Sequence, residues 1–197
     1  MKRASTRFWL CASAAAFIFA GFLSAFAYSQ DQKPVARKRV NEYTLAGLRP
    51  GRSTFAQARE LYRSAFFVHP SGGVSSTTRF CPNQTMEIKT GARDMISSVR
   101  IRAMQPDHYR CGTNAGLGWK TGKGLRIGGL KSRVVAIYGA PDSVSPSTEN
   151  GQPLELLYYA FGWAGPDVPQ IMEVVCTAPK DGTPGRVVEI ALGAGGL

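Results

Sequence analysis

The chain repeats one short pattern of glycines and tyrosines. Gly47–Gly51 (GLRPG) precedes a stretch with helical spacing that ends at Tyr62, and Gly124–Gly128 (GLRIG) precedes a second stretch that ends at Tyr138. The first glycines of the two patterns are 77 positions apart, and the two tyrosines are 76 apart. Self-similarity at a fixed spacing is typical of a duplicated structural unit. The repeat therefore predicts a chain built from two tandem units of the same kind.

Each unit is expected to be one helix followed by three antiparallel strands. Ser53 or Thr54 is a suitable N-cap for the first helix, and Gly139 fits a C-terminal cap for the second. The hydrophobic periodicity predicts strands at 77–81, 85–90 and 96–103, then a helix at 131–138 and strands at 154–161, 171–177 and 186–192. Helices that precede runs of strands are typical of an α+β fold. One helix on three strands buries little area, so the two units are expected to join their sheets or stack their helices.

The N-terminus has the pattern of an export signal. Three basic residues, Lys2, Arg3 and Arg7, precede an uncharged run from Phe8 to Ala27, which ends in the small-x-small sequence Ala-Phe-Ala. We expect cleavage after Ala27, which makes the protein periplasmic or secreted. An uncleaved membrane anchor is the alternative, because the 20 uncharged residues are just enough to span a bilayer.

A basic linker is expected to follow the signal peptide. The whole chain has a formal charge of +11, and removal of residues 1–27 takes away three of its 24 basic residues and none of its 13 acidic ones. Part of the remaining excess lies in Lys33, Arg37, Lys38 and Arg39. Such a tract binds nucleic acid or an anionic surface. For an exported protein we expect no nucleic acid, and an anionic membrane or wall surface is the candidate partner. A solvated, mobile linker is the simpler interpretation.

The predicted domain organisation follows from these features. It consists of a signal peptide at 1–27, the basic linker at 28–43, the first unit at 44–104, a glycine-rich loop between the units at 105–123, and the second unit at 124–193.

Three cysteines remain after cleavage at residue 27. Export permits a disulfide, and Cys81 and Cys111 both flank expected loops, so a bond between these two is the favoured interpretation. Cys176 lies in an apolar strand and is expected to be a small buried side chain. None of the cysteine spacings matches a zinc site, and no metal or other cofactor is expected.

The second unit also carries a pattern of glycines, a Gly-x-Pro and apolar strands along its whole length. The pattern comprises Gly124-Leu125-x-x-Gly128, Tyr138-Gly139-x-Pro141, Leu157-Tyr158-Tyr159, Met172-Glu173-Val174-Val175 and Gly185-Arg186-Val187-Val188-x-Ile190. It resembles the small outer-membrane assembly lipoproteins of the SmpA/OmlA (BamE-like) family, and two such units in tandem are the plan of the β-lactamase inhibitor proteins. The resemblance covers about residues 44–193 and implies the tandem α+β fold; it bears on fold more than on role.

Strand alternation predicts a binding face. Arg100 and Arg102 alternate with apolar residues and are expected on the outer face of their strand. Tyr158 alternates with two other aromatic residues, and Trp163 follows in the next loop. Arginine and exposed aromatic residues are the usual anchors of protein interfaces, although aromatic residues in a strand are also typical of a core. These four residues are the candidate binding residues.

One acid–base pair offers an alternative function. Asp107 precedes His108 in an expected loop, and a histidine beside a carboxylate can act as a general base when a nucleophile is near. This pair predicts a small hydrolase or transferase. The loop is also rich in glycine, but it lacks the order of a phosphate-binding P-loop.

The leading prediction is an exported, non-enzymatic protein-binding or scaffold module of the cell envelope.

Overall fold

A computed structural model describes residues 39–62, 67–68, 73–77, 84–104 and 119–194 of the chain. These residues all belong to one compact unit, Arg37–Leu197. Its helices are α1 (Phe55–Tyr62) and α2 (Lys131–Tyr138), with a short 3₁₀ turn at Ala92–Asp94. Its strands are β1 (Phe67–Val68), β2 (Gly73–Thr77), β3 (Gln84–Thr90), β4 (Ile96–Ala103), β5 (Ser143–Glu149), β6 (Gln152–Ala160), β7 (Pro169–Thr177) and β8 (Val187–Ala194).

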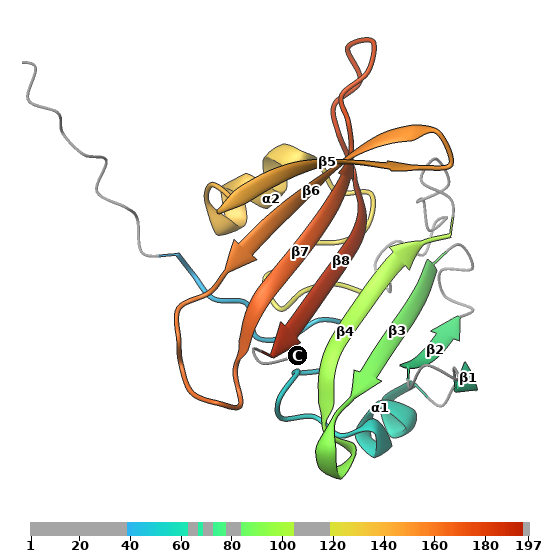
Figure 1. The fold of residues 1–197 in the computed structure, drawn as a ribbon, viewed down its shortest axis with the longest axis vertical. Helices are drawn as coiled ribbons and strands as arrows, with labels where there is room; N and C mark the ends of the chain where they lie inside the picture. Colours follow the sequence, from blue (N-terminus) through green and yellow to red (C-terminus); the bar gives the residue numbers. More distant parts are fainter. Residues whose placement is uncertain (1–38, 63–66, 69–72, 78–83, 105–118, 195–197) are drawn as a thin grey trace, which may run out of the picture. The chain divides into compact units, whose positions relative to one another are not determined.

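The eight strands that lie in the described residues form one antiparallel sheet. Their order is β1-β2-β3-β4-β8-β7-β6-β5 (Figure 1). The last strand of the chain, β8, pairs with β4 on one side and with β7 on the other. The two halves of the chain therefore share one continuous hydrogen-bonded sheet, with β8 at their junction.

The expected architecture of two tandem units, each with one helix and three strands, is wrong. Four strands follow α2, and the strands of both halves belong to the same sheet. The strand that the sequence did not predict after α2 is β5, whose polar sequence SVSPSTE is almost entirely exposed. A strand at the edge of a sheet tolerates proline and needs no apolar face, so Pro146 and the missing alternation concealed it.

Several individual elements agree with their sequence patterns. The helix expected at 131–138 is α2 and the strand expected at 96–103 is β4. Gly139 ends α2 with a φ of +82°, a conformation that favours glycine, and its N–H donates to the Val135 carbonyl at 2.8 Å. At the start of α1, the side chains of Thr54 and Gln57 each accept a hydrogen bond from the other's backbone N–H, which forms a capping box.

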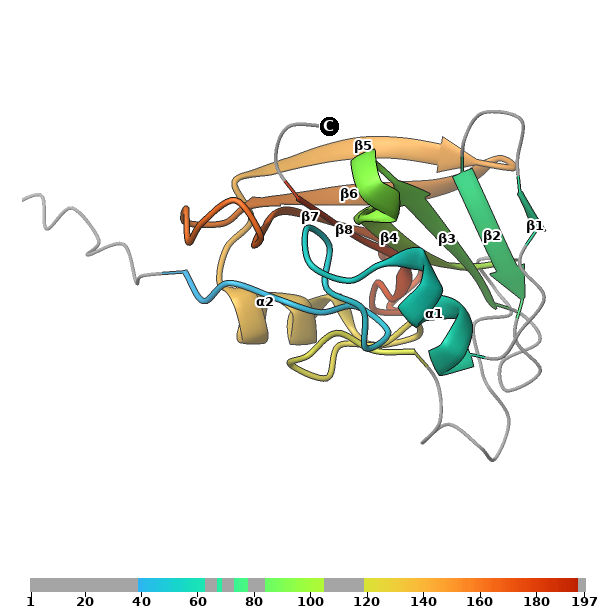
Figure 2. The same ribbon diagram turned by 90° about the horizontal axis from the view of Figure 1, so that it is seen from below.

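Both α-helices lie on the same side of the sheet, and neither of them covers the opposite side (Figure 2). The hydrophobic core lies between the sheet and the two α-helices. It is built mainly from alternate residues of the central strands, which are Met86, Ile88, Val99, Ile101, Leu157, Tyr159, Met172, Val174, Cys176, Ile190 and Leu192, together with Leu45, Leu48 and Leu125 from the loops. The side of the sheet without α-helices is called the open face below.

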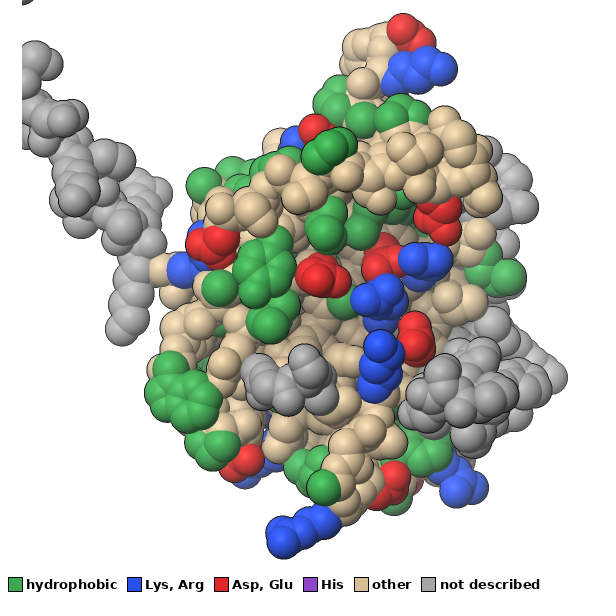
Figure 3. Space-filling model, in the orientation of Figure 1, with side chains coloured by type: hydrophobic (Ala, Val, Ile, Leu, Met, Phe, Trp, Pro, Cys, Tyr) green, Lys and Arg blue, Asp and Glu red, His purple; other side chains and the backbone are tan. Residues whose placement is uncertain are grey.

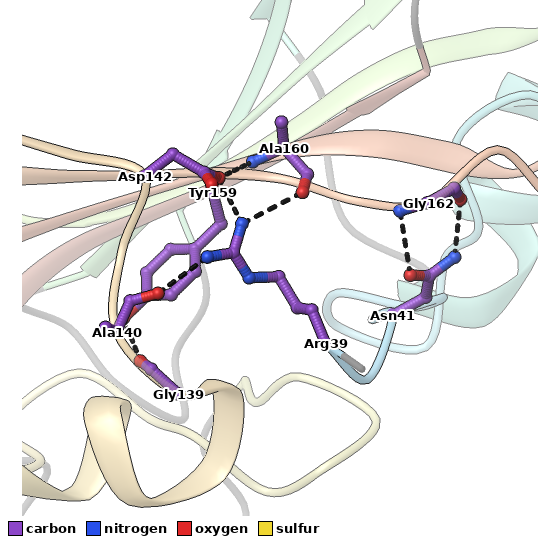
Figure 4. Close-up of polar contacts among 8 residues, drawn as sticks. All are labelled: Arg39, Asn41, Gly139, Ala140, Asp142, Tyr159, Ala160 and Gly162. Atoms are coloured by element: carbon purple, nitrogen blue, oxygen red, sulfur yellow. Dashed lines mark hydrogen bonds and ion pairs between the residues drawn. The ribbon is translucent and has the colours of Figure 1, made fainter. Parts of the chain in front are cut away.

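The segment 39–48, called the N-terminal strap, begins with a clamp at Arg39. The Arg39 guanidinium contacts four groups at one end of the sheet: the Asp142 carboxylate, the carbonyl oxygens of Ala140 (2.6 Å) and Ala160 (3.0 Å), and the ring of Tyr159, whose centroid is 5.3 Å away (Figure 4). Although burial alone would raise the pKa of Asp142, the Ala160 N–H and Arg39 together hold it below its usual range. Residues 39–43, expected in a mobile linker, are therefore attached to the fold.

Two further residues of the strap complete this attachment. The Asn41 amide pairs with the backbone of Gly162, donating to its carbonyl at 2.8 Å and accepting from its N–H at 3.1 Å (Figure 4). The Glu42 carboxylate, in a residue only 2% exposed, accepts hydrogen bonds from the N–H groups of Tyr43, Thr44, Gly122 and Lys123 and from the Tyr138 hydroxyl. Glu42 therefore connects the strap to residues 122–123. The sequence predicted a linker up to residue 43 and a loop at 105–123.

Candidate functional site

The strand register aligns charged and aromatic side chains in rows across the open face. Arg100 on β4 pairs with Ala191 on β8, which pairs with Glu173 on β7, which pairs with Tyr158 on β6. Residues directly opposite each other on neighbouring strands project from the same face. Tyr158 and Arg100 therefore lie in one row, with Glu173 between them.

A second row contains the most buried charge of this face. Arg102 on β4 pairs with Glu189 on β8, which pairs with Val175 on β7 and then Leu156 on β6. The Glu189 side chain is only 8% exposed, whereas Arg102 is 44% exposed. This row is thus charged at its β4 end and apolar at its β6 end.

Five charged residues from four strands form one network of ion pairs. Glu189 is its centre: one carboxylate oxygen lies 3.2 Å from Arg100 and the other 2.5 Å from Arg102. Arg100 also lies 3.7 Å from Glu173, and Arg102 lies 3.1 Å from Glu149. Figure 3 shows acidic and basic side chains gathered in the middle of this face. A nearly buried carboxylate with two guanidinium partners is compensated, so it fixes the arginine side chains in place.

The contact between Arg102 and Glu149 shows that the β5–β6 hairpin reaches across the open face. Glu149 ends β5, and three strands separate β5 from β4 in the sheet, yet their side chains form an ion pair. The hairpin turns at Asn150 and Gly151, whose φ values of +51° and +78° fit a two-residue turn of the primed type. The curled hairpin therefore forms one wall above the sheet.

Between this wall and β4 the open face is hollowed. The hollow has a volume of about 370 Å³. On its β6, β7 and β8 side the hollow is lined by the apolar side chains of Leu154, Leu156, Val175 and Val188. On its β4 and hairpin side it is lined by the five charged residues of the ion-pair network and by Ser147. A second, smaller hollow of about 140 Å³ lies beside Glu87, Lys89 and Arg100. The hollow thus combines an apolar floor with a charged rim.

The rim contains more acidic than basic side chains. Three carboxylates, from Glu149, Glu173 and Glu189, face two guanidinium groups in the lining of the larger hollow. Although burial lowers the pKa of Arg102, its hydrogen bond to Glu189 and the nearby carboxylates raise it above its usual value overall. By formal count, the lining has a charge of minus one in a protein that is basic as a whole.

The structure brings three of the four candidate binding residues together. Arg100, Arg102 and Tyr158 share the open face through the rows described above. Trp163 lies outside the sheet, in the loop that joins β6 to β7, and does not line the hollow. Its side chain is 71% exposed. Tyr159 and Phe161 are buried, and both rings contact Tyr138 of α2 on the helix side.

Other candidates from the sequence lie outside the described residues. These are Cys81 and Cys111 of the expected disulfide, the pair Asp107 and His108, and Lys33, Arg37 and Lys38 of the basic tract. Cys176 is described and is buried, and burial raises the pKa of its thiol to about 12. In the part of the chain that the structure describes, no His, Cys, Asp and Glu side chains group as a metal site requires.

Sequence reasoning missed the acidic half of the network. Glu149 and Glu189 were not singled out, because their pairing with Arg102 depends on strands far apart in the chain; Arg102 and Glu189 are separated by 87 positions. One local signal was present: the dipeptide Asn150-Gly151 is typical of a tight hairpin and would have predicted a strand before it.

No known family model matches the chain, and none of the curated proteins searched matches it. A solved structure with partial similarity is a cysteine-rich secretory protein from Staphylococcus aureus, with a TM-score of 0.43 and 11% sequence identity; the match covers 80% of this chain and 49% of that one. The chain therefore spans about half the length of that protein. A likeness of this size carries no argument about function.

The resemblance to the SmpA/OmlA family stays a prediction. Within the described residues, no helix has the length and apolarity needed to cross a membrane.

Proposed function

We propose that this protein is an exported, non-enzymatic binding module of the cell envelope, and that it binds a partner protein in the hollow of its open face. The observation that carries the proposal is the hollow itself, which has an apolar floor and a charged rim on a sheet face covered by neither helix. Protein interfaces have this anatomy, with an apolar centre inside a polar margin. The export signal in the sequence supports the envelope location.

The chemistry of the lining defines the kind of segment that fits. Leu156 and Val175 remain partly exposed and can receive an apolar side chain of the partner. Glu173 and Glu149, each 35% exposed, can receive a basic group beside it. The fitting partner segment therefore combines an apolar or aromatic anchor with an adjacent lysine or arginine.

The rim is organised before the partner arrives. Glu189 holds both arginines by charge-assisted hydrogen bonds or ion pairs, so their side chains lose little freedom on binding. Binding costs are lower when the interface groups are already ordered. This ordering is the reason to expect a specific partner instead of general adhesion to acidic or basic proteins.

The test is to fill the hollow without removing any of its contacts. Ser147 is exposed on β5 and lines the hollow, so Ser147→Trp places a large ring in it. Ser132 is also exposed, on α2 on the helix side, and Ser132→Trp is the matched control. The chain from residue 28 and both variants are immobilised and exposed to detergent-solubilised cell envelope, and the captured proteins are quantified.

We expect the unchanged chain and Ser132→Trp to capture the same protein with the same affinity. Ser147→Trp should weaken its binding at least about tenfold, which corresponds to about 1.4 kcal/mol. Equal capture by all three proteins would place the binding surface elsewhere, and no capture by any of them would remove the binding-module proposal.

A further inference from the structure

A second surface of the fold combines exposed apolar side chains with the point where the chain continues towards its N-terminus. Val40 and Tyr43 of the strap are 53% and 42% exposed, and Trp163 of the β6–β7 loop is 71% exposed. The Asn41 side chain is hydrogen-bonded to the Gly162 backbone and so connects the two segments (Figure 4). In the sequence, Val40 directly precedes Asn41 and Trp163 directly follows Gly162. Val40, Tyr43 and Trp163 are called the exit patch.

Positive charge accompanies the exit patch. The Arg49 guanidinium lies over the Tyr43 ring, 5.2 Å from its centroid, and among the described residues it forms no ion pair. The sequence adds Lys33, Arg37 and Lys38 just before the strap. Arg39 does not contribute, because its charge is taken up by Asp142. The basic tract that the sequence defines is therefore supplemented from the fold by Arg49.

The chain before the strap leads to an apolar segment. Residues 8–27 are uncharged, and 11 residues, 28–38, separate them from the strap. An extended chain spans at most about 3.5 Å per residue, so this connection reaches at most about 40 Å. The strap is the part of the fold that is covalently connected to this apolar segment.

We infer that the exit patch docks on the surface of a bilayer containing anionic lipids. Trp and Tyr are enriched at the level of lipid headgroups because their rings are apolar with a polar edge. Lys and Arg near the surface add attraction to anionic lipids. An anionic wall polymer would satisfy the charges but offers no apolar layer to Val40 and Trp163, so the lipid surface fits both properties. This docking is independent of the hollow and of any protein partner there.

The experiment uses the chain from residue 28, which contains the whole compact unit from Arg37 onward. It is sedimented with vesicles of phosphatidylcholine, with or without phosphatidylglycerol. Trp119, which is buried, and Trp163 are the tryptophans of this chain. Brominated lipids therefore quench fluorescence only if Trp163 enters the bilayer surface, and Trp163→Phe identifies the quenched residue.

We expect binding only to the vesicles with phosphatidylglycerol, quenching that disappears in Trp163→Phe, and binding that weakens as salt rises. The double variant Val40→Ser/Trp163→Ser should bind at least about tenfold more weakly. The control variant Met104→Ser/Val135→Ser removes exposed apolar side chains from the end of β4 and from α2, and should bind unchanged. Equal loss in both double variants, unquenched Trp163, or no vesicle binding would overturn the inference, and none of these results would affect the partner test in the hollow.

Discussion

At the scale of single residues, Glu42 has the largest structural consequence. A buried carboxylate is costly unless its oxygens are satisfied, and Glu42 accepts five hydrogen bonds from four backbone N–H groups and the Tyr138 hydroxyl. Thr121 bonds the same hydroxyl at 2.8 Å. Burial is the main reason that the pKa of Tyr138 is raised, so the hydroxyl remains a donor throughout the neutral range. Gly122 is required for the close approach, because an added Cβ would lie 2.6 Å from a Glu42 oxygen.

Glu42→Gln tests this role. The amide keeps the size of the side chain but turns an NH₂ group towards donors, so buried donors lose their acceptor. We expect the free energy of unfolding, measured by urea denaturation, to fall by about 2 kcal/mol. Glu60→Gln, an exposed change on α1, is the control and should alter stability by less than about 0.5 kcal/mol. A Glu42→Gln protein as stable as the control would show that the strap is held by other contacts.

At the scale of elements, local patterns predicted what is local and failed where strands far apart meet. The strand at 96–103 and the helix at 131–138 have strong periodicity and were predicted at their true bounds. Edge strand β5 lacks an apolar face, so periodicity could not reveal it. Local alternation predicted Arg100, Arg102 and Tyr158 as outward-facing. The pairing of β4 with β8 depends on the register of segments far apart in the chain, so the sequence did not predict the carboxylates that contact the two arginines.

The β5–β6 hairpin gives a prediction at this scale. The ion pair between Glu149 and Arg102 holds the hairpin over the hollow, and a partly exposed pair of this kind contributes at most about 1 kcal/mol. In Glu149→Gln we expect amide hydrogens of the hairpin to exchange up to about fivefold faster, as measured by hydrogen–deuterium exchange. Raising the salt concentration should accelerate exchange in the unchanged protein but much less in the variant. Unchanged hairpin exchange in Glu149→Gln would mean that backbone pairing with β6 alone fixes the wall.

At the scale of the whole molecule, the continuous sheet predicts a single cooperative unfolding transition. Because β8 is hydrogen-bonded to both halves, neither half keeps a complete sheet without the other. Cys176 on β7 reports the loss of the core, since burial raises the pKa of its thiol to about 12 and the protonated thiol is unreactive. This raised pKa stabilises the fold at pH values below the thiol's ordinary value, and that contribution is lost as pH rises towards 12.

The transition can be followed with two probes on one variant. In the chain from residue 28 with Cys81→Ser and Cys111→Ser, Cys176 is the remaining thiol. We expect its reaction with a thiol reagent at pH 8 to begin at the same urea concentration at which the far-UV circular dichroism is lost. Early labelling, before the dichroism changes, would show that the β5–β8 half opens separately.

The central claim is that the open face is the surface that meets a partner. Hydrogen–deuterium exchange of the chain from residue 28, free and in complex with the protein captured from the envelope, tests it most directly. We predict slower exchange in the complex at the β5–β6 hairpin and along β4, β7 and β8, with α1 and α2 unchanged. Protection confined to the helices and the strap, with the hairpin unaffected, would contradict the assignment of the hollow as the binding site.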